Sequence, residues 1–465
     1  MARITKFFIQ RIKGQLERQY GPLKKVTVMG LGLHGGGLSA VYFFNQLGIK
    51  VVVTDLKKEK DLKESLKKVR HLKNIEFVLG QHRDIDFINT DLIIKNPAVP
   101  HNSPYLKIAA KHKIPIESDI GLFFELCRAP IIGVTGTKGK STTTALIAHF
   151  LKLKYSDVIL AGNLRRPVLD VLDKINFKTK VILELSSWQL EDMKKHQKSP
   201  HIAIITNIMP DHLNSYSNFK QYVSAKKLIF KFQKPNDYLI VNNNDSLLKQ
   251  ISPQAKSKVV FFNRQKVEGW KTFFYGEHNL DNLAAALEVT KLFKIPEREI
   301  KNSLKRFKNL EGRMEVVAKI KGITFINDTT ATIPEAAIAG LSSLINNKNS
   351  TAKIILIAGG ADKNLDFKKF AEFIIQKAEA NEIKKVILLT GTATEKIKAE
   401  ISKYNSKLDF IKETNSMEKA VKQAKSVAQK GDIVLLSPGA ASFGLFAHEF
   451  ERGKKFNQAV FKFFS

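Results

Sequence analysis

A glycine-rich segment that ends in Gly-Lys-Ser constrains the fold of this chain more than any other feature. Residues 133–143 read Gly-Val-Thr-Gly-Thr-Lys-Gly-Lys-Ser-Thr-Thr, between a short apolar run and a helical pattern. In this strand, loop and helix order, backbone N–H groups face a phosphate, Lys140 meets the terminal phosphates and the Ser141 hydroxyl can bind Mg²⁺. Val134 stands where the commonest GTPase pattern has its first glycine. The segment therefore predicts a nucleotide-phosphate loop of another kind.

Short β-branched runs alternate with helical stretches along the whole chain, which predicts α/β domains with parallel sheets. The expected strands are 26–29, 51–54, 92–95, 131–134, 181–185, 202–206, 239–241, 353–358, 385–389 and 433–436, and a further strand is expected to end in Asn327 and Asp328. A length of 465 residues suggests about three domains. Helical segments at 119–127 and 297–308 mark the boundaries, so we expect domains at 1–118, 119–309 and 310–465.

Composition limits the classes of function. The single cysteine, Cys127, cannot form an internal disulfide, no apolar run is long enough to span a bilayer, and the N-terminus lacks a signal-peptide pattern, so we expect a cytoplasmic protein. Lysine and arginine number 76 against 44 acidic residues, a net charge of +32. These lysines are spread over the chain without a nucleic-acid-binding motif, which favours solvated helix faces over nucleic-acid binding. The positive field would still attract anionic substrates.

A second glycine motif lies near the N-terminus. Gly30, Gly32 and Gly35 follow an expected strand and open a helix, and Asp55 ends the next strand. The spacing matches a dinucleotide-binding fingerprint, which alone would suggest an NAD enzyme. Any pyrophosphate at a helix N-terminus needs the same glycines. In a chain with an ATP loop, we expect this motif to hold another nucleotide.

Polar residues cluster after the phosphate loop. Glu184 follows an expected strand, where a carboxylate can hold the second side of Mg²⁺. His212 also follows a strand, and by itself is better read as a buried structural histidine than as a metal ligand. Nothing intrinsic distinguishes Lys226 from a solvated lysine. Asn279 and Asn282 open a helix, where they either bond a base or ribose or cap the helix.

These blocks together resemble the Mur ligases, the ATP-dependent amino-acid ligases of peptidoglycan precursor synthesis, whose relatives include folylpolyglutamate synthase. The resemblance covers essentially the whole chain and is carried by residues 133–143, 184–191, 206–214, 276–282, 310–315, 359–363 and 437–443. The Glu-Leu-Ser-Ser-Trp-Gln-Leu-Glu block at 184–191 is similar to that of the member that adds D-glutamate. The resemblance implies an N-terminal Rossmann-like domain, a central P-loop ATPase-like parallel sheet and a C-terminal Rossmann-like domain.

The resemblance also implies roles in the central domain. Glu184 would bind a first Mg²⁺ with Ser141, and His212 would help to bind a second. Lys226 matches a lysine that is carbamylated in the family, and a carbamate is an anion that can bridge magnesium ions. ATP would further contact Gly136, Thr137, Lys138, Gly139, Lys140, Thr142, Asn279 and Asn282, and, from the C-terminal domain, Arg313 and Asp328.

For the other substrates the resemblance implies three groups of contacts. The UDP end of the precursor would contact Leu33, His34 and Asp55, and its remainder Asn163 and Ser186. The incoming amino acid would contact Thr332, Lys363, Ser442 and Phe443. Three positions depart from the family pattern: Arg166 replaces a glycine, Thr330 replaces a lysine of the amino-acid pocket, and Glu449-Phe450 replaces Phe-Glu.

The expected reaction joins D-glutamate to UDP-N-acetylmuramoyl-L-alanine at the cost of ATP, in a protein expected to be monomeric. The precursor carboxylate attacks the γ-phosphate to give an acyl phosphate, and the glutamate amine then displaces phosphate. Addition of L-glutamate or another amino acid stays open as an alternative. An NAD-dependent oxidoreductase would leave Lys140, Glu184 and His212 without a role, and a nucleic-acid ATPase would need a groove of clustered basic residues.

Overall fold

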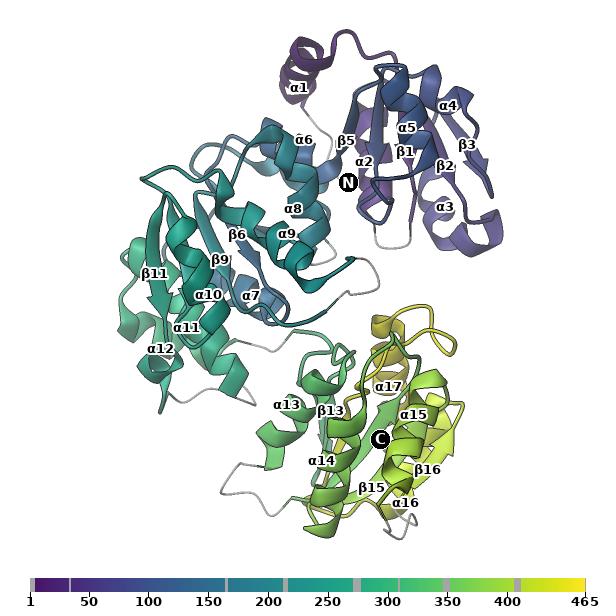
Figure 1. Ribbon diagram of the computed structural model, residues 1–465, viewed down its shortest axis with the longest axis vertical. Coiled ribbons are helices and arrows are strands. Elements are labelled where there is room, and N and C mark those ends of the chain that lie inside the picture. Colours follow the sequence, from purple (N-terminus) through teal and green to yellow (C-terminus); the bar gives the residue numbers. More distant parts are fainter. Residues whose placement is uncertain are drawn as a thin grey trace. The chain divides into compact units, whose positions relative to one another are not determined.

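Three β-sheets organise the chain (Figure 1). The computed structural model describes residues 5–32, 35–163, 166–211, 216–270, 277–307, 310–345, 352–404 and 411–464, with the backbone alone at 277 and 278. The chain divides into two compact units, of which the first comprises Met1–Asn263 with Asn282–Ile300 and the second Arg264–Asp281 with Lys301–Ser465. The first unit holds two of the sheets and the second unit holds the third.

The first sheet is parallel throughout, in the order β3-β2-β1-β4-β5. Its strands are β1 (Lys25–Met29), β2 (Lys50–Asp55), β3 (Ile75–Leu79), β4 (Leu92–Lys95) and β5 (Ile116–Ser118). Helices α1 (Lys6–Tyr20), α2 (Gly36–Gln46), α3 (Lys63–Val69), α4 (Ile85–Ile88) and α5 (Pro104–Lys111) belong to this region. The valines of β1 and β2 are fully buried, as expected for strands covered on both faces.

The second sheet is also parallel, in the order β11-β10-β9-β6-β8-β7. Its strands are β6 (Ile131–Thr135), β7 (Val158–Gly162), β8 (Lys180–Glu184), β9 (Ile202–Ile205), β10 (Tyr238–Asn242) and β11 (Lys258–Phe262). The accompanying helices are α6 (Asp119–Leu126), α7 (Lys140–Leu151), α8 (Ser187–Met193), α9 (Phe219–Lys231), α10 (Ser246–Ile251), α11 (Glu277–Leu292) and α12 (Glu297–Leu304). Because β6 lies between β8 and β9, the loops after these three strands meet at one edge.

The third sheet has the order β12-β13-β17-β14-β15-β16, and its edge strand β12 runs antiparallel to β13. The strands are β12 (Glu315–Ile320), β13 (Ile323–Asn327), β14 (Ile354–Gly359), β15 (Ile383–Leu389), β16 (Ile411–Thr414) and β17 (Ile433–Leu436). Helices α13 (Pro334–Ile345), α14 (Lys368–Glu379) and α15 (Thr392–Ser402) cover one face, where Leu356 is buried. Helices α16 (Met417–Val427) and α17 (Glu449–Phe464) cover the other, where Ile357 is buried.

Buried contacts join the first two sheets within their shared unit. Lys95 at the end of β4 forms an ion pair of 2.6 Å with Asp192 of α8, and both side chains are almost fully buried. Glu117 of β5 accepts a hydrogen bond of 2.9 Å from the Tyr20 hydroxyl and lies 3.0 Å from the His196 ring. One hydrophobic core runs through α1, α2, α6, α8 and α9. The first unit is therefore held together by both apolar and charged contacts.

The ten strands expected with both bounds are present, with boundaries within two residues, and the strand expected to end near Asn327 is β13. The predicted α/β class is confirmed. The expectation of parallel pairing is wrong only for β12, which forms a hairpin with β13 through a two-residue turn at Lys321 and Gly322. Both turn residues have positive φ, 52° and 78°, which suits such a tight connection. None of the described helices has the length and apolar character needed to cross a membrane.

Candidate functional site

The phosphate loop connects β6 to α7 as predicted, and two of its glycines are required by their surroundings. Gly136 has φ 148° and Gly139 has φ 83°. A Cβ atom at Gly136 would lie 1.9 Å from the Thr206 hydroxyl, and one at Gly139 would lie 2.2 Å from Oδ1 of Asn282. Lys140 begins α7, so the N–H groups of its first turn and the loop N–H groups lie at the carboxyl end of β6. This is the arrangement that binds phosphate in other loops of this kind.

The segment after β9 fixes the shape of the phosphate loop. The Thr206 hydroxyl donates to the Lys138 carbonyl at 2.6 Å, and the Asn207 side chain both accepts from the Lys138 N–H and donates to its carbonyl. The Thr137 hydroxyl accepts from the Met209 N–H at 3.0 Å. These contacts fix the conformation of the loop, and a loop that is already ordered loses less entropy when a phosphate binds.

Two lysine ammonium groups meet at one carbonyl of this loop. Lys140 Nζ and Lys226 Nζ each donate to the Gly136 oxygen at 2.9 Å. Lys226 lies on α9, is 2% exposed, and its ammonium stands 4.6 Å from the centroid of the Tyr222 ring. Burial and then the nearby charge of Lys140 lower the pKa of Lys226 well below its usual value, while Asp211 and Glu184 oppose the shift. Burial and Lys140 therefore both shift Lys226 toward its neutral form.

Glu184 supplies a buried carboxylate with one unused oxygen. It ends β8, is 2% exposed, and its Oε1 accepts a hydrogen bond of 3.1 Å from Asn163. Its Oε2 is buried without a hydrogen-bond partner. Ser141 is also 2% exposed, at the start of α7. A bare carboxylate oxygen near a phosphate loop suits the oxygen ligands that Mg²⁺ prefers. Within the described ranges, which leave out His212, no three acidic, histidine or cysteine side chains form a group that could hold a metal ion.

Helix α11 carries both of the predicted asparagines, and one of them lies against the phosphate loop. Asn282 Oδ1 accepts a hydrogen bond of 3.2 Å from the Thr143 hydroxyl of α7, and Asn282 is 4% exposed. Asn279 lies one turn earlier on the same helix and is also buried. The structure therefore places Asn282 against the loop.

The N-terminal glycine motif forms the expected turn between β1 and α2. Gly30, Gly32 and Gly35 all have positive φ, and the Gly32 N–H donates to Asp55 Oδ2 at 3.2 Å. Asp55 thus braces the loop that precedes α2. Leu33 and His34, predicted to contact the UDP end, lie outside the described residues, as does His212. Ser186 has a structural task, since its side chain caps α8 in a reciprocal arrangement with Gln189.

In the second unit, the predicted amino-acid residues follow three adjacent strands of the third sheet. Thr332 lies after β13, Lys363 after β14, and Ser442 and Phe443 after β17. Lys363 Nζ lies 3.4 Å from the Thr332 hydroxyl, so the structure brings these two together. Ser442 is buried whereas the Phe443 ring is 59% exposed.

The residues predicted to contact ATP from the second unit, Arg313 and Asp328, lie on either side of the β12–β13 hairpin. The Asp328 carboxylate accepts hydrogen bonds from the Met314 N–H at 3.2 Å and from the Ser437 hydroxyl at 3.0 Å. It therefore helps to shape its own loop.

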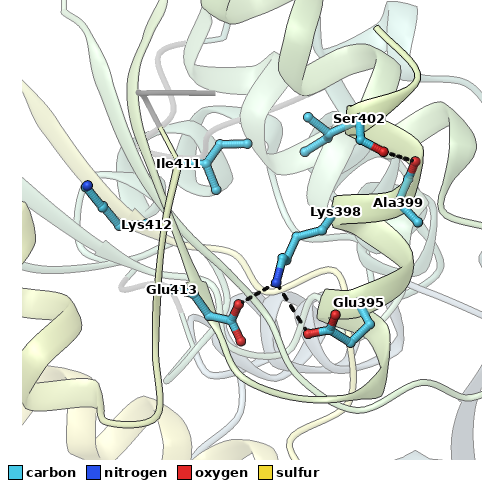
Figure 2. Close-up of a pocket in the computed structure, with 8 residues that line it drawn as sticks. Glu395, Lys398, Ala399, Ser402, Ile411, Lys412 and Glu413 are labelled. Carbon is cyan, nitrogen blue, oxygen red and sulfur yellow. Dashed lines mark hydrogen bonds and ion pairs between the residues drawn. The ribbon is translucent and has the colours of Figure 1, made fainter. Parts of the chain in front are cut away.

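A separate pocket of about 490 Å³ lies between α15 and β16 (Figure 2). Lys398 pairs there with Glu413 at 2.8 Å and with Glu395 at 3.6 Å. None of the residues predicted to bind substrate lines this pocket. This pocket is therefore not the site that the sequence predicts.

Comparison with family models assigns the three regions in turn. The N-terminal domain model of the MurD-like Mur ligases matches residues 24–118, the Mur ligase middle domain matches residues 134–276, and the Mur ligase glutamate ligase domain matches residues 312–439. The chain belongs to the Mur ligase family.

Individual relatives agree with this assignment. The UDP-N-acetylmuramoylalanine–D-glutamate ligase of Roseiflexus sp. (strain RS-1) is 39% identical over 95% of this chain and 99% of its own length. The ligase of the same name from Borreliella afzelii (strain PKo) is 38% identical over 93% and 96%. Among solved structures, the UDP-N-acetylmuramate-alanine ligase MurC of Thermotoga maritima matches with a TM-score of 0.60 at 18% identity, covering 94% of this chain and 99% of that one. These structures share the Mur ligase fold.

A second Mur ligase of Thermotoga maritima, MurF in complex with ADP, matches with a TM-score of 0.59 at 20% identity over 89% of this chain and 95% of that one. The Mur ligase fold thus accounts for the phosphate loop, Glu184 and Lys226 meeting at one sheet edge. Sequence reasoning missed two supports of the phosphate loop: Asn207, and Tyr222, whose hydroxyl lies 3.3 Å from the Thr137 hydroxyl. The position of Asn207 directly after an expected strand was a usable signal, whereas Tyr222 had none.

Proposed function

We propose that this Mur ligase joins D-glutamate to UDP-N-acetylmuramoyl-L-alanine, with cleavage of ATP to ADP and phosphate, in peptidoglycan precursor synthesis. The observation that carries the ligase chemistry is the convergence of the phosphate loop, Glu184 and Lys226 at the carboxyl ends of adjacent strands. The substrate pair is supported by relatives of that name, 39% and 38% identical over almost the whole chain. Domains at 1–118, 119–309 and 310–465 would bind the UDP end, ATP and the amino acid.

The first chemical step is attack of the precursor carboxylate on the γ-phosphate of ATP. Two anions must approach, so cations and N–H groups aimed at the phosphate lower the barrier most. Lys140 and the N–H groups of residues 136–142 would bind the phosphate oxygens. For this the Lys140 ammonium would exchange its hydrogen bond to the Gly136 carbonyl for hydrogen bonds to phosphate oxygens. The acyl phosphate then accepts the glutamate amine at its carbonyl carbon, and phosphate leaves. Holding the reactants in line supplies much of the remaining acceleration.

Magnesium would be held by Ser141, Glu184 and His212, and when bound it supplies positive charge to the phosphates and to the reacting carboxylate. The unpaired Glu184 Oε2 supports this assignment. A carbamate on Lys226 would complete the ligand set. Carbon dioxide reacts with a neutral amine, which becomes N-carboxylated and loses one proton. The lowered pKa of Lys226, caused first by burial and then by Lys140, favours that neutral amine.

The remaining contacts follow the same assignment. Asn279, Asn282, Arg313 and Asp328 would contact the nucleoside and phosphates of ATP. Leu33, His34, Asp55, Asn163 and Ser186 would contact the UDP-linked precursor. Thr332, Lys363, Ser442 and Phe443 would hold the amino acid. The protein would act as a cytoplasmic monomer, where Cys127 stays inert because burial raises its pKa to about 11.

A coupled phosphate-release assay tests the proposal. Purified protein is incubated with ATP, Mg²⁺ and UDP-N-acetylmuramoyl-L-alanine, alone or with D-glutamate, L-glutamate, NAD or DNA. Release that depends on D-glutamate, with a UDP-linked product heavier by one glutamate residue, supports the proposal. Release with L-glutamate in preference to D-glutamate overturns the amino-acid assignment, a possibility that Thr330 keeps open. Lys140→Ala should lower turnover by about 100-fold or more, whereas Lys152→Ala, exposed at the end of the same helix, should not.

A further inference from the structure

A fully buried arginine lies beneath the loops of the proposed amino-acid pocket. Arg452, on α17, has 0% exposure, and its guanidinium donates three hydrogen bonds. Nε donates to the Thr329 hydroxyl at 3.1 Å, Nη2 to the Thr329 carbonyl at 2.8 Å and Nη1 to the Ala440 carbonyl at 3.1 Å. All three acceptors are neutral oxygens. In the part of the chain that the structure describes, no carboxylate lies within ion-pair distance of this guanidinium.

Arg452 links loops that follow three adjacent strands. Thr329 follows β13 and Ala440 follows β17, and a Cβ atom at Gly360, after β14, would lie 3.5 Å from Nη1 of Arg452. The loops are also bonded to one another, because Ala361 and Ala441 exchange two backbone hydrogen bonds of 3.0 Å. The helix can approach this closely because the residue after Arg452 is Gly453, where a Cβ atom would lie 2.7 Å from the Thr329 methyl group.

A buried guanidinium charge without a counter-ion lowers the stability of the folded protein unless an anion binds nearby. Removing a cation from water without a counter-ion is strongly unfavourable, and replacing such a group by an apolar one is often neutral or stabilising. Burial lowers the pKa of Arg452 to about 10, while the more distant carboxylates of Glu449 and Asp328 offset part of that effect. Arg452 therefore still carries its charge at neutral pH, directly under loops that carry Thr332, Lys363 and Ser442.

The geometry points to Arg452 as a positioning residue for the amino-acid substrate. The three hydrogen bonds of its planar guanidinium hold the loops after β13 and β17 in one arrangement. Its buried positive charge stabilises an anionic substrate bound next to these loops. The charge acts through the loops that it braces, and no direct contact with the substrate is required. This inference deepens the proposed function and rests on it. It also assigns a cation to the pocket in which Thr330 replaces the family lysine.

Four single variants test the inference, with the KM for D-glutamate and the KM for ATP measured in each. Arg452→Met removes the charge and all three hydrogen bonds. Arg452→Lys keeps the charge but loses the planar guanidinium. Thr329→Val keeps Arg452 and removes the hydroxyl that accepts from Nε. Lys454→Met, exposed two residues further along the same helix, is the matched control for loss of one positive charge.

We expect Arg452→Met to raise the KM for D-glutamate by at least about tenfold, which corresponds to about 1.4 kcal/mol, with the KM for ATP within about twofold of the parent value. Arg452→Lys should recover most of this loss, Thr329→Val should raise the KM for D-glutamate by a smaller factor, and Lys454→Met should change neither KM. Equal effects of Arg452→Met and Arg452→Lys, or parallel increases in both KM values, would overturn the role of the charge.

Folding and function are separated by two further measurements. Thermal unfolding of each variant reports whether it folds, and if Arg452→Met does not fold, the Arg452→Lys and Thr329→Val values decide the matter. An unchanged KM for D-glutamate in both would then refute the inference. If the parent protein does not use D-glutamate as a substrate, the proposed function is wrong. That result is obtained with the parent protein alone, so it is distinct from any effect of the Arg452 variants.

Discussion

At the scale of single residues, the chemistry of the candidate site comes from side chains whose burial changes their charge or their bonding. Lys226 is the sharpest case, because burial and the charge of Lys140 lower its pKa in the folded protein. In the unfolded chain the same lysine is protonated up to about pH 10.4. Between these two pKa values the unfolded state binds more protons than the folded state, so stability rises with pH across that range.

The first prediction follows from this increase of stability with pH. Lys226→Met should raise the melting temperature of the protein at pH 7 in buffer free of carbon dioxide, because methionine fills the site without a proton cost. The gain should shrink as pH rises toward 10, where the unfolded lysine also becomes neutral. Differential scanning calorimetry at several pH values measures this directly, with Lys227→Met on the same helix as control. A gain that stays constant with pH would mean that protonation of Lys226 does not contribute.

Single residues also differ in how far the sequence reveals them. Lys140 and Ser141 could be predicted from spacing alone, and Glu184 from its place after a strand, because the carboxyl ends of parallel strands converge. Lys226 stood out only through the family resemblance, since one lysine in a lysine-rich chain has no local signal. Arg452 had no signal at all, because its importance depends on tertiary burial and on three acceptors that are distant from it in sequence.

At the scale of elements, the phosphate loop joins a strand and a helix through backbone conformations that only glycine adopts easily. The second prediction is that Gly139→Ala raises the KM for ATP by about tenfold or more, since a Cβ atom there would lie 2.2 Å from Asn282 Oδ1. The positive φ of 83° adds a cost of about 1–2 kcal/mol for alanine. Steady-state kinetics with ATP varied gives the answer.

Gly269→Ala is the matched control for this loop variant. Gly269 has a similar positive φ of 77°, but a Cβ atom there would meet no atom within 4 Å. It should lose stability by a comparable backbone cost while the KM for ATP stays unchanged. If the two variants affected ATP equally, the contact with Asn282 would not matter.

Elements were predicted best where they are buried on both sides. The strands that sequence reasoning missed are β3, β5, β7, β11, β12 and β16, and each lies at an edge of its sheet. Interior strands are continuous apolar runs, whereas β12 has no fully buried residue and β16 has one. An edge strand needs burial on fewer sides, so its sequence carries polar residues such as Lys412 and Glu413 and lacks the apolar run.

A buried ion pair connects elements of the first unit, and it gives the third prediction. Lys95→Met, at the end of β4, leaves the Asp192 carboxylate of α8 buried, with the exposed His101 ring 3.6 Å away. The loss should be about 3–5 kcal/mol of unfolding free energy, measured by urea denaturation. Burial already raises the pKa of Asp192, so protonation favours the folded state and the loss should shrink as pH falls.

The double variant Lys95→Met with Asp192→Asn is the control for this pair. It removes both charges and should recover a large part of the lost stability, because no unpaired carboxylate remains in the interior. A double variant as unstable as Lys95→Met alone would mean that packing of the lysine stem, and not the charge of Asp192, sets the cost.

At the scale of the whole molecule, three sheets organise the chain, and their order along it could be predicted from the alternation of strands and helices. The division into two compact units could not, because Arg264–Asp281 belongs with the C-terminal unit although it precedes part of the first unit in sequence. Such an assignment depends on contacts between segments that are distant in sequence, and no local pattern reports them.

The net charge of +32 is likewise a property of the whole molecule, and it acts in two opposite directions. Excess like charge destabilises a compact state by self-repulsion, while the same field draws anionic substrates to the protein. Salt screens both effects, because the Debye length falls from about 14 Å at 0.05 M to about 6 Å at 0.3 M ionic strength. Raising potassium chloride should therefore stabilise the fold and weaken substrate capture together.

The fourth prediction is that the melting temperature rises by at least about 2 °C between these two salt concentrations, the shift expected for roughly 1 kcal/mol. Over the same range the KM for the UDP-linked precursor should increase, and more steeply than the KM for D-glutamate, because the precursor carries more negative charge. Sucrose at matched osmolality controls for non-ionic effects. If the melting temperature fell, or if both KM values rose equally, the positive charges would be paired locally and would not act as one field. Self-repulsion would then be too weak to explain any cost of carrying so many lysines.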